Sequence, residues 1–243
     1  MALSVFRSPD VLARHAAREF STRGGAAIAA RGRFAVALSG GTTPRAMLEK
    51  LADADLTADV DWDRVHVFWS DERCVPPENE ASNYGTARRV LLDRVPLPPD
   101  NVHRMRGELE PQSAAQRYGD DLSAFFGAVQ PRFDLIYLGL GTDGHTASLF
   151  PGTAALAVTN VACVANHVAS DAAHSWRLTL TYPAINAGRA VIFLVQGVAK
   201  APVLRQIMTT PALTPALPAQ MISPDGELFW FADAAAASTL EDR

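Results

Sequence analysis

The chain has 243 residues, of which 48% are hydrophobic and 20% charged, and its net charge is −4 at pH 7. This is the profile of an ordinary globular protein that is long enough to bury a sizeable core. Acidic and basic residues are mixed along the chain, so no basic run indicates a nucleic acid as partner. No apolar stretch is long enough to cross a bilayer, so we expect no membrane partner either.

The two cysteines, Cys74 and Cys163, lie far apart and form no cluster with histidines. Their spacing disfavours both a disulfide framework and a zinc site, so we expect no metal. The charged residues from Arg7 onward are not typical of a secretory signal. We therefore expect a reduced, cytoplasmic protein. A single domain over residues 1–243 is expected because no linker, repeat or shift in composition divides the chain.

The first expected element is a helix over residues 9–30. Ser8 is a candidate N-cap, Pro9 suits the first turn, and Asp10 lies near the positive end of the helix dipole. Two adjacent glycines at positions 24 and 25 predict that this helix bends or splits there. A short apolar strand over residues 33–38 follows.

The loop after this strand consists of small and hydroxyl residues: Ser39, Gly40, Gly41, Thr42 and Thr43. It leads into a helix over residues 44–51. Backbone N–H groups in such a loop, together with the N-terminus of the helix, form a favourable site for a phosphate. No Gly-Lys-Ser/Thr sequence follows, so the loop is not a Walker A motif, and a sugar phosphate is favoured over ATP. A plain tight turn is the alternative.

A short aromatic strand is expected over residues 65–69, and it is followed by the charged residues Asp71, Glu72 and Arg73. A charge run is usually a solvated turn. Here, however, the strand has the composition of a central strand, and the loop over residues 74–82 is long and rich in proline without being of low complexity. Loops of that kind often carry function, so we expect these charged side chains to belong to a site.

Two helices are expected next, over residues 83–92 and 112–126, on either side of a proline-rich connector. A buried strand that begins near Phe133 then ends in three glycines: Gly139, Gly141 and Gly144. They match the G-x-G-x-x-G dinucleotide fingerprint, which needs an acidic residue about 20 positions further on. The next acidic residue after Asp143 is Asp171. A nicotinamide is therefore disfavoured, and no cofactor is expected.

The remaining elements are strands over 161–165, 176–180, 190–195 and 228–231, helices over 182–186 and 199–208, a stiff proline-rich loop over 211–218 and a tail whose alanines favour a helix. Lys200 falls in the first turn of one of these helices. The helix dipole disfavours a cation there unless an anion lies between them. A lysine that extends its side chain to solvent is an equal alternative.

Strands and helices alternate nearly throughout, which predicts an α/β fold: a Rossmann-like, largely parallel sheet with helices on both faces. Four strand ends carry polar groups, at residues 39–43, 71–73, 143–145 and 196–200. In one sheet these ends meet at a common edge, which is where ligands of open α/β sheets bind. His145 is then the natural general base at neutral pH, beside two carboxylates and several anion-binding groups.

Several stretches resemble the 6-phosphogluconolactonase family of the glucosamine/galactosamine-6-phosphate isomerase superfamily: LSGGTTP at 38–44, WSDER at 69–73, SNY at 82–84, GLGTDGHTASLFP at 139–151, RLTLT at 177–181 and GVAK at 197–200. The resemblance covers nearly the whole chain in order. It implies a glucosamine-6-phosphate deaminase-like fold. It also implies hydrolysis of 6-phospho-D-glucono-1,5-lactone to 6-phospho-D-gluconate, a step of the oxidative pentose phosphate pathway, without a cofactor. The partner is then a small-molecule sugar phosphate, and a monomer is one option for the assembly.

The resemblance also implies roles for individual residues. His145 takes a proton from the water that attacks the lactone carbonyl, and returns it to the departing ring oxygen. Asp143 or Asp71 orients His145 or stabilises its imidazolium. The phosphate and the developing oxyanion are held by the loop over residues 39–43 and by three cations, whose individual tasks are left open: Arg73, Arg177 and Lys200.

Two alternatives stay open: a related sugar-phosphate isomerase or deaminase, and a non-catalytic sugar-phosphate sensor on the same fold. The isomerases and deaminases of this superfamily carry a Glu five residues after the His of Asp-Gly-His, where this chain has Phe150. The deaminases usually have Tyr after Asp-Glu, where this chain has Arg73. Both departures favour the lactonase. A sensor is expected to carry an additional or DNA-binding domain, for which this chain has no room.

Overall fold

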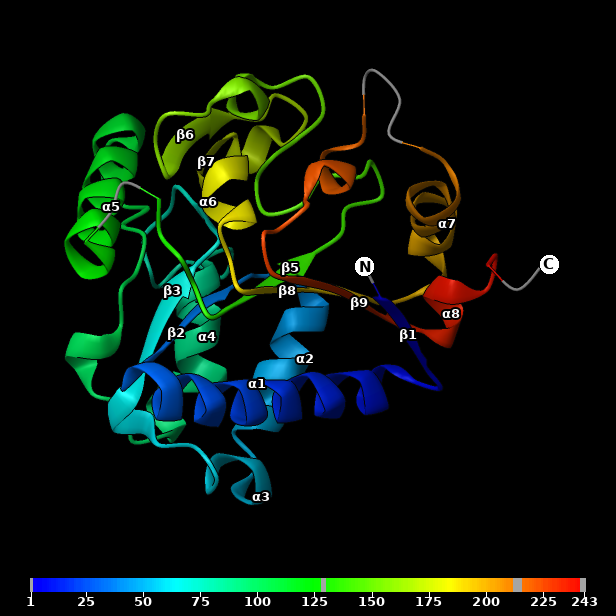
Figure 1. Ribbon diagram of the computed structural model, residues 1–243. Coiled ribbons are helices and arrows are strands. Elements are labelled where there is room, and N and C mark those ends of the chain that lie inside the picture. The colour runs from blue at the N-terminus through cyan, green and yellow to red at the C-terminus, as the bar shows by residue number, and fades with distance from the viewer. Residues whose placement is uncertain (1, 128–129, 212–215, 241–243) are drawn as a thin grey trace.

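The computed structural model describes residues 2–127, 130–211 and 216–240, with a six-stranded sheet in the order β1-β9-β8-β5-β2-β3 at its centre (Figure 1). Its strands are β1 (Ala2–Phe6), β2 (Phe34–Leu38), β3 (Val65–Trp69), β5 (Leu135–Gly139), β8 (Ala190–Val195) and β9 (Glu227–Asp233). All neighbouring pairs are parallel. The predicted α/β architecture with a largely parallel sheet is therefore confirmed. We call the edge where these strands begin the amino edge, and the opposite one the carboxyl edge.

A second, three-stranded sheet is antiparallel and consists of β4 (Asp71–Arg73), β7 (Trp176–Leu180) and β6 (Cys163–His167) in the order β4-β7-β6. The expectation that all strands share one sheet is therefore wrong. The chain passes from one sheet to the other at Ser70, whose N–H donates to the carbonyl of Leu38 (2.8 Å) and whose carbonyl accepts from the N–H of Leu180 (2.8 Å). This single residue thus ties the charged segment after β3 to both sheets.

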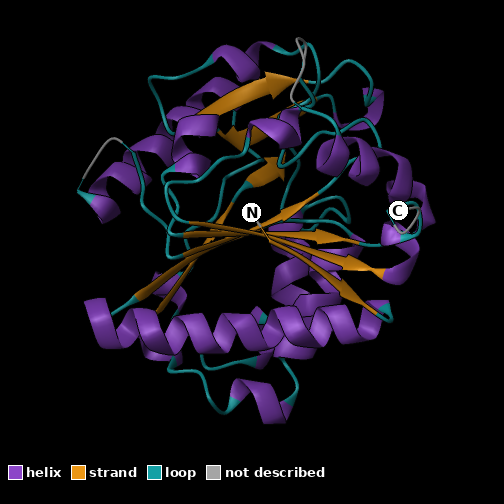
Figure 2. Cartoon of the chain, turned by 45° about the vertical axis from the view of Figure 1, so that its right-hand side comes forward, coloured by secondary structure: helices purple, strands orange, loops and turns teal. Residues whose placement is uncertain are grey.

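Helices cover both faces of the parallel sheet. Figure 2 shows the sheet nearly edge-on, with the long α1 on one side and the antiparallel sheet on the other. The helices are α1 (Pro9–Arg31), α2 (Thr42–Leu51), α3 (Ala54–Thr57), α4 (Asn83–Val90), α5 (Pro111–Phe126), α6 (Tyr182–Asn186), α7 (Ala201–Thr209) and α8 (Ala234–Ala237). The short α8 confirms the helical tail.

Helix α1 begins as expected, because the hydroxyl of Ser8 caps it by accepting the N–H of Val11 (3.4 Å). The predicted split is wrong, since the helix continues through both glycines. Gly24 serves a different purpose there: a Cβ at this position would lie 3.1 Å from Cδ1 of Phe34. The missing side chain therefore lets α1 approach the start of β2 closely.

Several element boundaries differ from those expected. Helix α2 begins at Thr42, and α7 follows a 3₁₀ turn over Val198–Lys200. Strand β1 was not predicted at all; it is a short edge strand whose Leu3 and Val5 are exposed, and it pairs with β9 from the far end of the chain. Residues 212–215 of the predicted loop over 211–218 lie outside the described residues. In the ranges that the structure describes, no helix is long and apolar enough to span a membrane.

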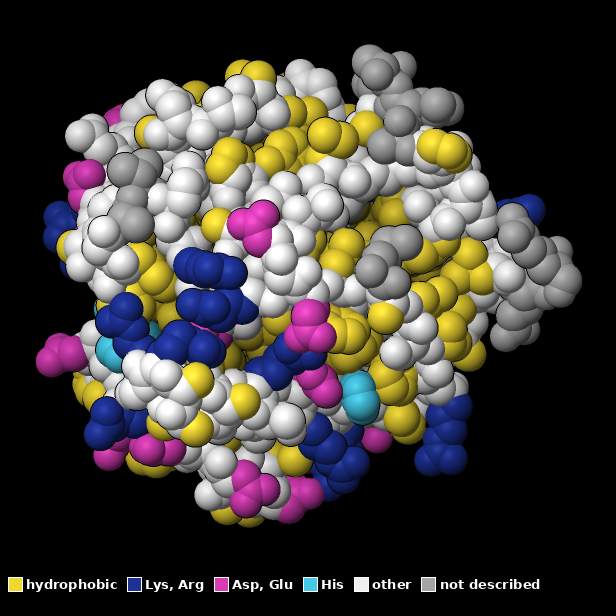
Figure 3. All heavy atoms as spheres, in the orientation of Figure 1, with side chains coloured by type: hydrophobic (Ala, Val, Ile, Leu, Met, Phe, Trp, Pro, Cys, Tyr) yellow, Lys and Arg dark blue, Asp and Glu magenta, His cyan; other side chains and the backbone are white. Residues whose placement is uncertain are grey.

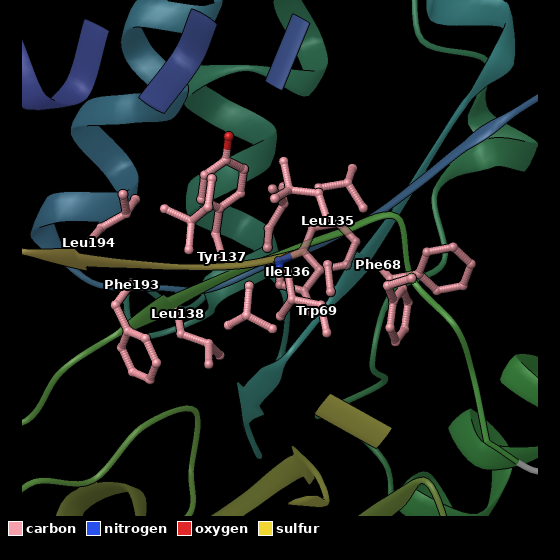
Figure 4. Packing of buried hydrophobic residues seen from close by; sticks show 14 of the residues in the cluster. Phe68, Trp69, Leu135, Ile136, Tyr137, Leu138, Phe193 and Leu194 are labelled. Atoms are coloured by element: carbon pink, nitrogen blue, oxygen red, sulfur yellow. The ribbon is translucent and has the colours of Figure 1, made fainter. Parts of the chain in front are cut away.

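The core is built on the central strands, whose side chains are buried on both faces of the sheet. Figure 4 shows Tyr137 and Leu138 of β5 beside Phe193 of β8, with Phe68 of β3 further along. Such continuous apolar runs are typical of parallel strands that helices cover on both sides. The hydroxyl of Tyr137 donates to the carbonyl of Ala16 in α1 (2.7 Å). The core therefore fixes the strand ends against the helical layer.

Arginines gather at the amino edge. Figure 3 shows dark blue side chains left of centre, in the region where β5 and β8 begin in Figure 1. The buried carboxylate of Asp134, just before β5, accepts hydrogen bonds from Nε of Arg31 (2.9 Å) and from the N–H of Ala35 (2.9 Å). Nε of Arg189 lies 3.4 Å from the same carboxylate. Asp134 thus holds the ends of three elements together at this edge.

Candidate active site

A cleft with a free volume of about 200 Å³ opens at the carboxyl edge of the parallel sheet. Its walls come from the ends of β2, β5 and β8, from β4 of the second sheet and from the first residue of α4. The lining residues are Ser39, Gly40, Gly41, Thr42, Thr43, Pro44, Asp71, Arg73, Asn83, Gly139, Leu140, Gly141, His145, Ala147, Leu194, Gln196 and Lys200. The structure therefore brings the four polar segments together, although one of them belongs to the other sheet.

His145 is held by the carboxylate of Asp143. Nδ1 of the imidazole lies 2.6 Å from Oδ1 of Asp143, and the backbone N–H of His145 donates to the same oxygen (3.1 Å). A carboxylate only accepts hydrogen bonds, so Nδ1 carries the proton and the lone pair of Nε2 is left for chemistry. The ring of Phe150 stacks on the imidazole, with centroids 3.9 Å apart. The imidazole is thus fixed in both tautomer and orientation.

The backbone around His145 is a tight turn that only small residues allow. A Cβ at Gly141 would lie 2.1 Å from Nδ1 of His145, and the N–H of Gly141 donates to the carbonyl of His145 (2.8 Å). Gly144 has φ +81°, and Ala147 has φ +48°, an unusual value for a residue with a side chain. Backbone held in this region often marks a functional site.

Asp143 remains ionised over the neutral range. Partial burial acts to raise the pKa of this carboxyl group, but the hydrogen bonds and the charge of His145 outweigh that effect, and the net pKa lies below its ordinary value. An ionised Asp143 stabilises a protonated His145, which is what an acid–base histidine requires during turnover.

Asp71, the other candidate partner of His145, has different neighbours. Its Oδ2 accepts from the hydroxyl of Ser148 (2.7 Å), and its Oδ1 lies 3.3 Å from the hydroxyl of Ser70. No hydrogen bond joins Asp71 to His145 among the residues that the structure describes. Of the two carboxylates that the sequence left open, Asp143 is therefore the one hydrogen-bonded to the imidazole, while Asp71 faces the cleft from β4.

The loop over residues 39–43 lies at the N-terminus of α2. Gly41, with φ +100°, precedes the helix and provides no side-chain cap, so the first N–H groups of α2 remain available to a ligand. The hydroxyl of Ser39 is used differently from the expectation: it donates to the carbonyl of Tyr137 (2.7 Å) and lies 2.6 Å from the hydroxyl of Ser70. It therefore joins β2 to β5 within the fold.

Two cations face the cleft with donors to spare. Arg73 gives one hydrogen bond, from Nη1 to the carbonyl of Ala81 (2.7 Å), whereas its Nε is buried without a partner among the described residues. Lys200 forms no hydrogen bond or ion pair within the part of the chain that the structure describes. Partial burial lowers the pKa of Lys200, and the charge of Asp143 acts in the opposite direction. Both side chains are thus suited to an anionic ligand.

Arg177, the third predicted cation, is not brought to the cleft. It lies opposite Arg73 in the β4–β7 pair, but its side chain is buried and binds Asp171 and the carbonyl of His174 (2.9 Å). Burial lowers the pKa of Arg177, with a further contribution from the charge of Arg73. In this arrangement Arg177 secures the turn before β7.

Sequence reasoning assigned no role to Asn83 and Gln196, although both line the cleft. Gln196 lies in the polar segment after β8, and Asn83 in the Ser-Asn-Tyr stretch that begins α4. The position of Asn83 at a helix start after a long loop was the available signal. In the described ranges, no group of three or more His, Cys, Asp or Glu residues could hold a metal ion.

Known proteins share both the sequence and the fold. Residues 7–230 match the family model described as glucosamine-6-phosphate isomerases/6-phosphogluconolactonase. The chain is 42% identical to a 6-phosphogluconolactonase of Nostoc sp. over 88% of both chains, and 41% identical to one of Synechocystis sp. over 98% of both.

Several solved structures have the same fold as this chain. The crystal structure of devB protein has a TM-score of 0.90 at 33% identity, with 98% of this chain and 99% of that chain covered. The 6-phosphogluconolactonase from Trypanosoma brucei has a TM-score of 0.84 at 27% identity, with 98% of both covered. A monomeric glucosamine-6-phosphate deaminase shares the fold, with a TM-score of 0.82 at 18% identity and 98% and 99% covered. The chain belongs to the glucosamine-6-phosphate isomerase/6-phosphogluconolactonase family.

Proposed function

We propose that the protein hydrolyses 6-phospho-D-glucono-1,5-lactone to 6-phospho-D-gluconate, a step of the pentose phosphate pathway. The observation that carries this proposal is the His145–Asp143 pair, which lies in the same cleft as two cations with unused donors, Arg73 and Lys200. The general base suits hydrolysis of the neutral lactone ring, and the neighbouring cations suit the phosphate that the substrate carries. The relatives named as 6-phosphogluconolactonases support the same substrate.

In this proposal His145 acts as base and then as acid. Nε2 takes a proton from water while the water oxygen forms a bond to the lactone carbonyl carbon, and the carbonyl becomes an oxyanion. When that tetrahedral intermediate collapses, the bond from the carbonyl carbon to the ring oxygen breaks, and the ring oxygen takes the proton back from Nε2. Asp143 keeps Nδ1 protonated throughout and stabilises the imidazolium, as its 2.6 Å contact supports.

The positive groups in the cleft divide between the phosphate and the oxyanion. We assign the phosphate to Lys200 and to the N–H groups at the start of α2, because a helix N-terminus and an ammonium both suit a dianion. We assign Arg73 to both tasks, since it lines the cleft two residues from Asp71 and forms no ion pair among the described residues. The pairing of Arg177 with Asp171 gives no support for a direct role of Arg177.

Phe150 favours hydrolysis over isomerisation or deamination at carbon. Its ring stacks on His145, at the position where the isomerases and deaminases of the superfamily carry a Glu. An apolar ring cannot shuttle protons along the sugar chain, whereas a single imidazole is sufficient for the hydrolysis of a lactone.

The test is to follow acid release from freshly prepared 6-phosphogluconolactone, with and without the protein, and to subtract spontaneous hydrolysis. We expect a protein-dependent rate that saturates with substrate. Glucosamine 6-phosphate serves as the comparison substrate, and ammonia release from it is expected to be absent. Ammonia release without lactone hydrolysis would move the assignment to the deaminases.

We also propose that the enzyme acts in the cytoplasm as a monomeric, single-domain protein. The family match over residues 7–230 supports one domain, and the free thiols of Cys74 and Cys163 are compatible with a reducing compartment. Light scattering after gel filtration tests the assembly, and cell fractionation tests the location.

A further inference from the structure

Asn83 is the first residue of α4, and both its backbone and its side chain are fixed. The carboxylate of Glu72 accepts the N–H groups of Asn83 (2.7 Å) and Tyr84 (2.8 Å) at the N-terminus of this helix. It also accepts from the hydroxyl of Ser82 (3.1 Å) and from the N–H of Arg73 (2.7 Å). Glu72 is 2% exposed, so water does not compete for these bonds. A buried carboxylate therefore clamps α4 to β4.

The side-chain amide of Asn83 has only one possible orientation. Its nitrogen faces two acceptors, the carbonyl of Asp71 (2.9 Å) and Oδ1 of Asp71 (3.4 Å). An amide oxygen in that place would meet two oxygens, so Nδ2 must point to Asp71 and Oδ1 must point the other way. The orientation follows from these two neighbouring acceptors.

Oδ1 of Asn83 is an acceptor without a donor. No hydrogen bond reaches it among the described residues, and it is not one of the fully buried unpartnered atoms. Asn83 is only 5% exposed and lines the cleft, so we place Oδ1 at the cleft wall. It lies against Gly40, where an added Cβ would be 1.8 Å away. The acceptor is therefore held between the anion-binding loop and Asp71.

We infer that Asn83 determines specificity by accepting a hydrogen bond from one ring hydroxyl of the sugar lactone. The inference rests on the proposed function, since it concerns the same cleft. Cations and N–H groups recognise the phosphate and the carbonyl oxygen, but a hydroxyl hydrogen needs an acceptor. Oδ1 of Asn83 provides one that is neutral and already in place, so binding requires no reorganisation of the protein.

The experiment measures kcat/KM for 6-phosphogluconolactone and for its 2-deoxy, 3-deoxy and 4-deoxy forms, in the wild type and in Asn83→Ala. In the wild type, one deoxy form should be slower by about tenfold or more, because the buried acceptor loses its partner. In Asn83→Ala, the same deoxy form should differ from the parent lactone by less than about threefold. This comparison of ratios cancels any general damage from the substitution.

Two further variants complete the design. The Cβ that Gly40→Ala adds would displace Oδ1 of Asn83, although all hydrogen-bonding groups are retained. We therefore expect this variant to reduce the same discrimination among the lactones. Asn101→Ala is the matched control: its amide donates to the carbonyl of Asp63, away from the cleft, and the wild-type pattern should persist. The inference is overturned if Asn83→Ala and Gly40→Ala discriminate among the lactones as the wild type does. Failure of the wild type to hydrolyse even the parent lactone would instead overturn the proposed function, and this inference with it.

Discussion

At the amino edge of the parallel sheet, Arg31 and Arg189 form ion pairs with the buried carboxylate of Asp134, whereas at the carboxyl edge Arg73 and Lys200 form no ion pair in the described ranges. The two edges terminate the same strands and share the same core. The difference is that two arginines at the amino edge share a carboxylate of the protein, while neither cation at the carboxyl edge forms an ion pair among the described residues. Charge alone therefore does not distinguish a site, but the partners of each charge do.

The carboxylates differ in the same way. Asp134 accepts hydrogen bonds from a backbone N–H and from Arg31 and forms an ion pair with Arg189, so its partners all lie within the protein. Asp143 holds an imidazole whose other nitrogen has no hydrogen bond within the described part of the chain. Substitutions at the two edges should therefore affect different quantities: stability at the amino edge, and rate or KM at the carboxyl edge.

The largest expected effect is on His145. We expect His145→Ala to reduce kcat for the phospholactone by about 10²–10⁴-fold, the usual contribution of a general base, with the fold unchanged. Initial rates after subtraction of spontaneous hydrolysis measure this, and circular dichroism checks the fold. His167→Ala, which changes an exposed histidine on β6, is the matched control and should retain wild-type rates. A His145→Ala rate close to that of the wild type would contradict the assignment.

The next largest effect is on KM, and it distinguishes the cations of the carboxyl edge from those of the amino edge. Charge-assisted hydrogen bonds contribute about 1.5–3 kcal/mol, so removal of Arg73 or Lys200 should raise KM about tenfold or more. We expect kcat to hold in Lys200→Ala and to fall in Arg73→Ala, because Arg73 also steadies the oxyanion. Arg132→Ala removes an exposed cation at the amino edge and should change neither quantity.

A lactone without the phosphate provides the control for this prediction. Phosphorylated and unphosphorylated gluconolactone are compared by steady-state kinetics. Both cleft variants should lose part of the wild-type preference for the phosphorylated lactone. If both retain that preference in full, the phosphate binds elsewhere in the protein.

At the amino edge the expected effect is smaller and thermodynamic. Asp134→Asn should reduce the free energy of unfolding by about 1–3 kcal/mol, because two guanidinium groups lose their counter-charge and one hydrogen bond is weakened. Urea denaturation measures this, and kcat/KM of the folded variant should stay within about twofold of the wild type. Asp63→Asn, on an exposed turn, is the control. A large loss of activity without a loss of stability would mean that the two edges are coupled.

The smallest expected effect is that of a chelator. The proposed chemistry uses one imidazole and fixed positive charges, and the described residues contain no group of three metal-binding side chains. Dialysis against a strong chelator should therefore leave kcat and KM unchanged. A loss that added zinc or magnesium restores would contradict this prediction.

Much of the fold was predictable because the central strands are continuous apolar runs that end in polar residues. The strands at 34–38, 135–139 and 190–195 lie where the pattern placed them, and the polar groups after them meet in one cleft. The second sheet was not predictable in the same way. Its strand β4 has three residues, too few for any periodicity, and those residues are charged.

Side-chain partners were the least predictable part of the site. Arg177 and Lys200 are both cations at plausible positions, yet Arg177 is committed to Asp171 across a turn that the sequence did not indicate. Ser39 lies in a loop that suits an anion, but its hydroxyl is committed to the carbonyl of Tyr137. Motifs identified which residues gather at the edge. Only the hydrogen bonds in the structure show which of these residues keep a donor or acceptor for a ligand.

The pairing of β1 with β9 has a consequence for the order of folding. Val5 lies opposite Ala232 in this parallel pair, so β1 joins a strand that is made much later than β1 itself. At typical rates of translation, β1 waits roughly 10 to 45 s before its partner is made. During that time α1 and β2 can pack locally, but β1 has no strand to pair with. The short length of β1 limits the unpaired strand edge that the nascent chain exposes, and β1 can join the sheet only after β9 has been made.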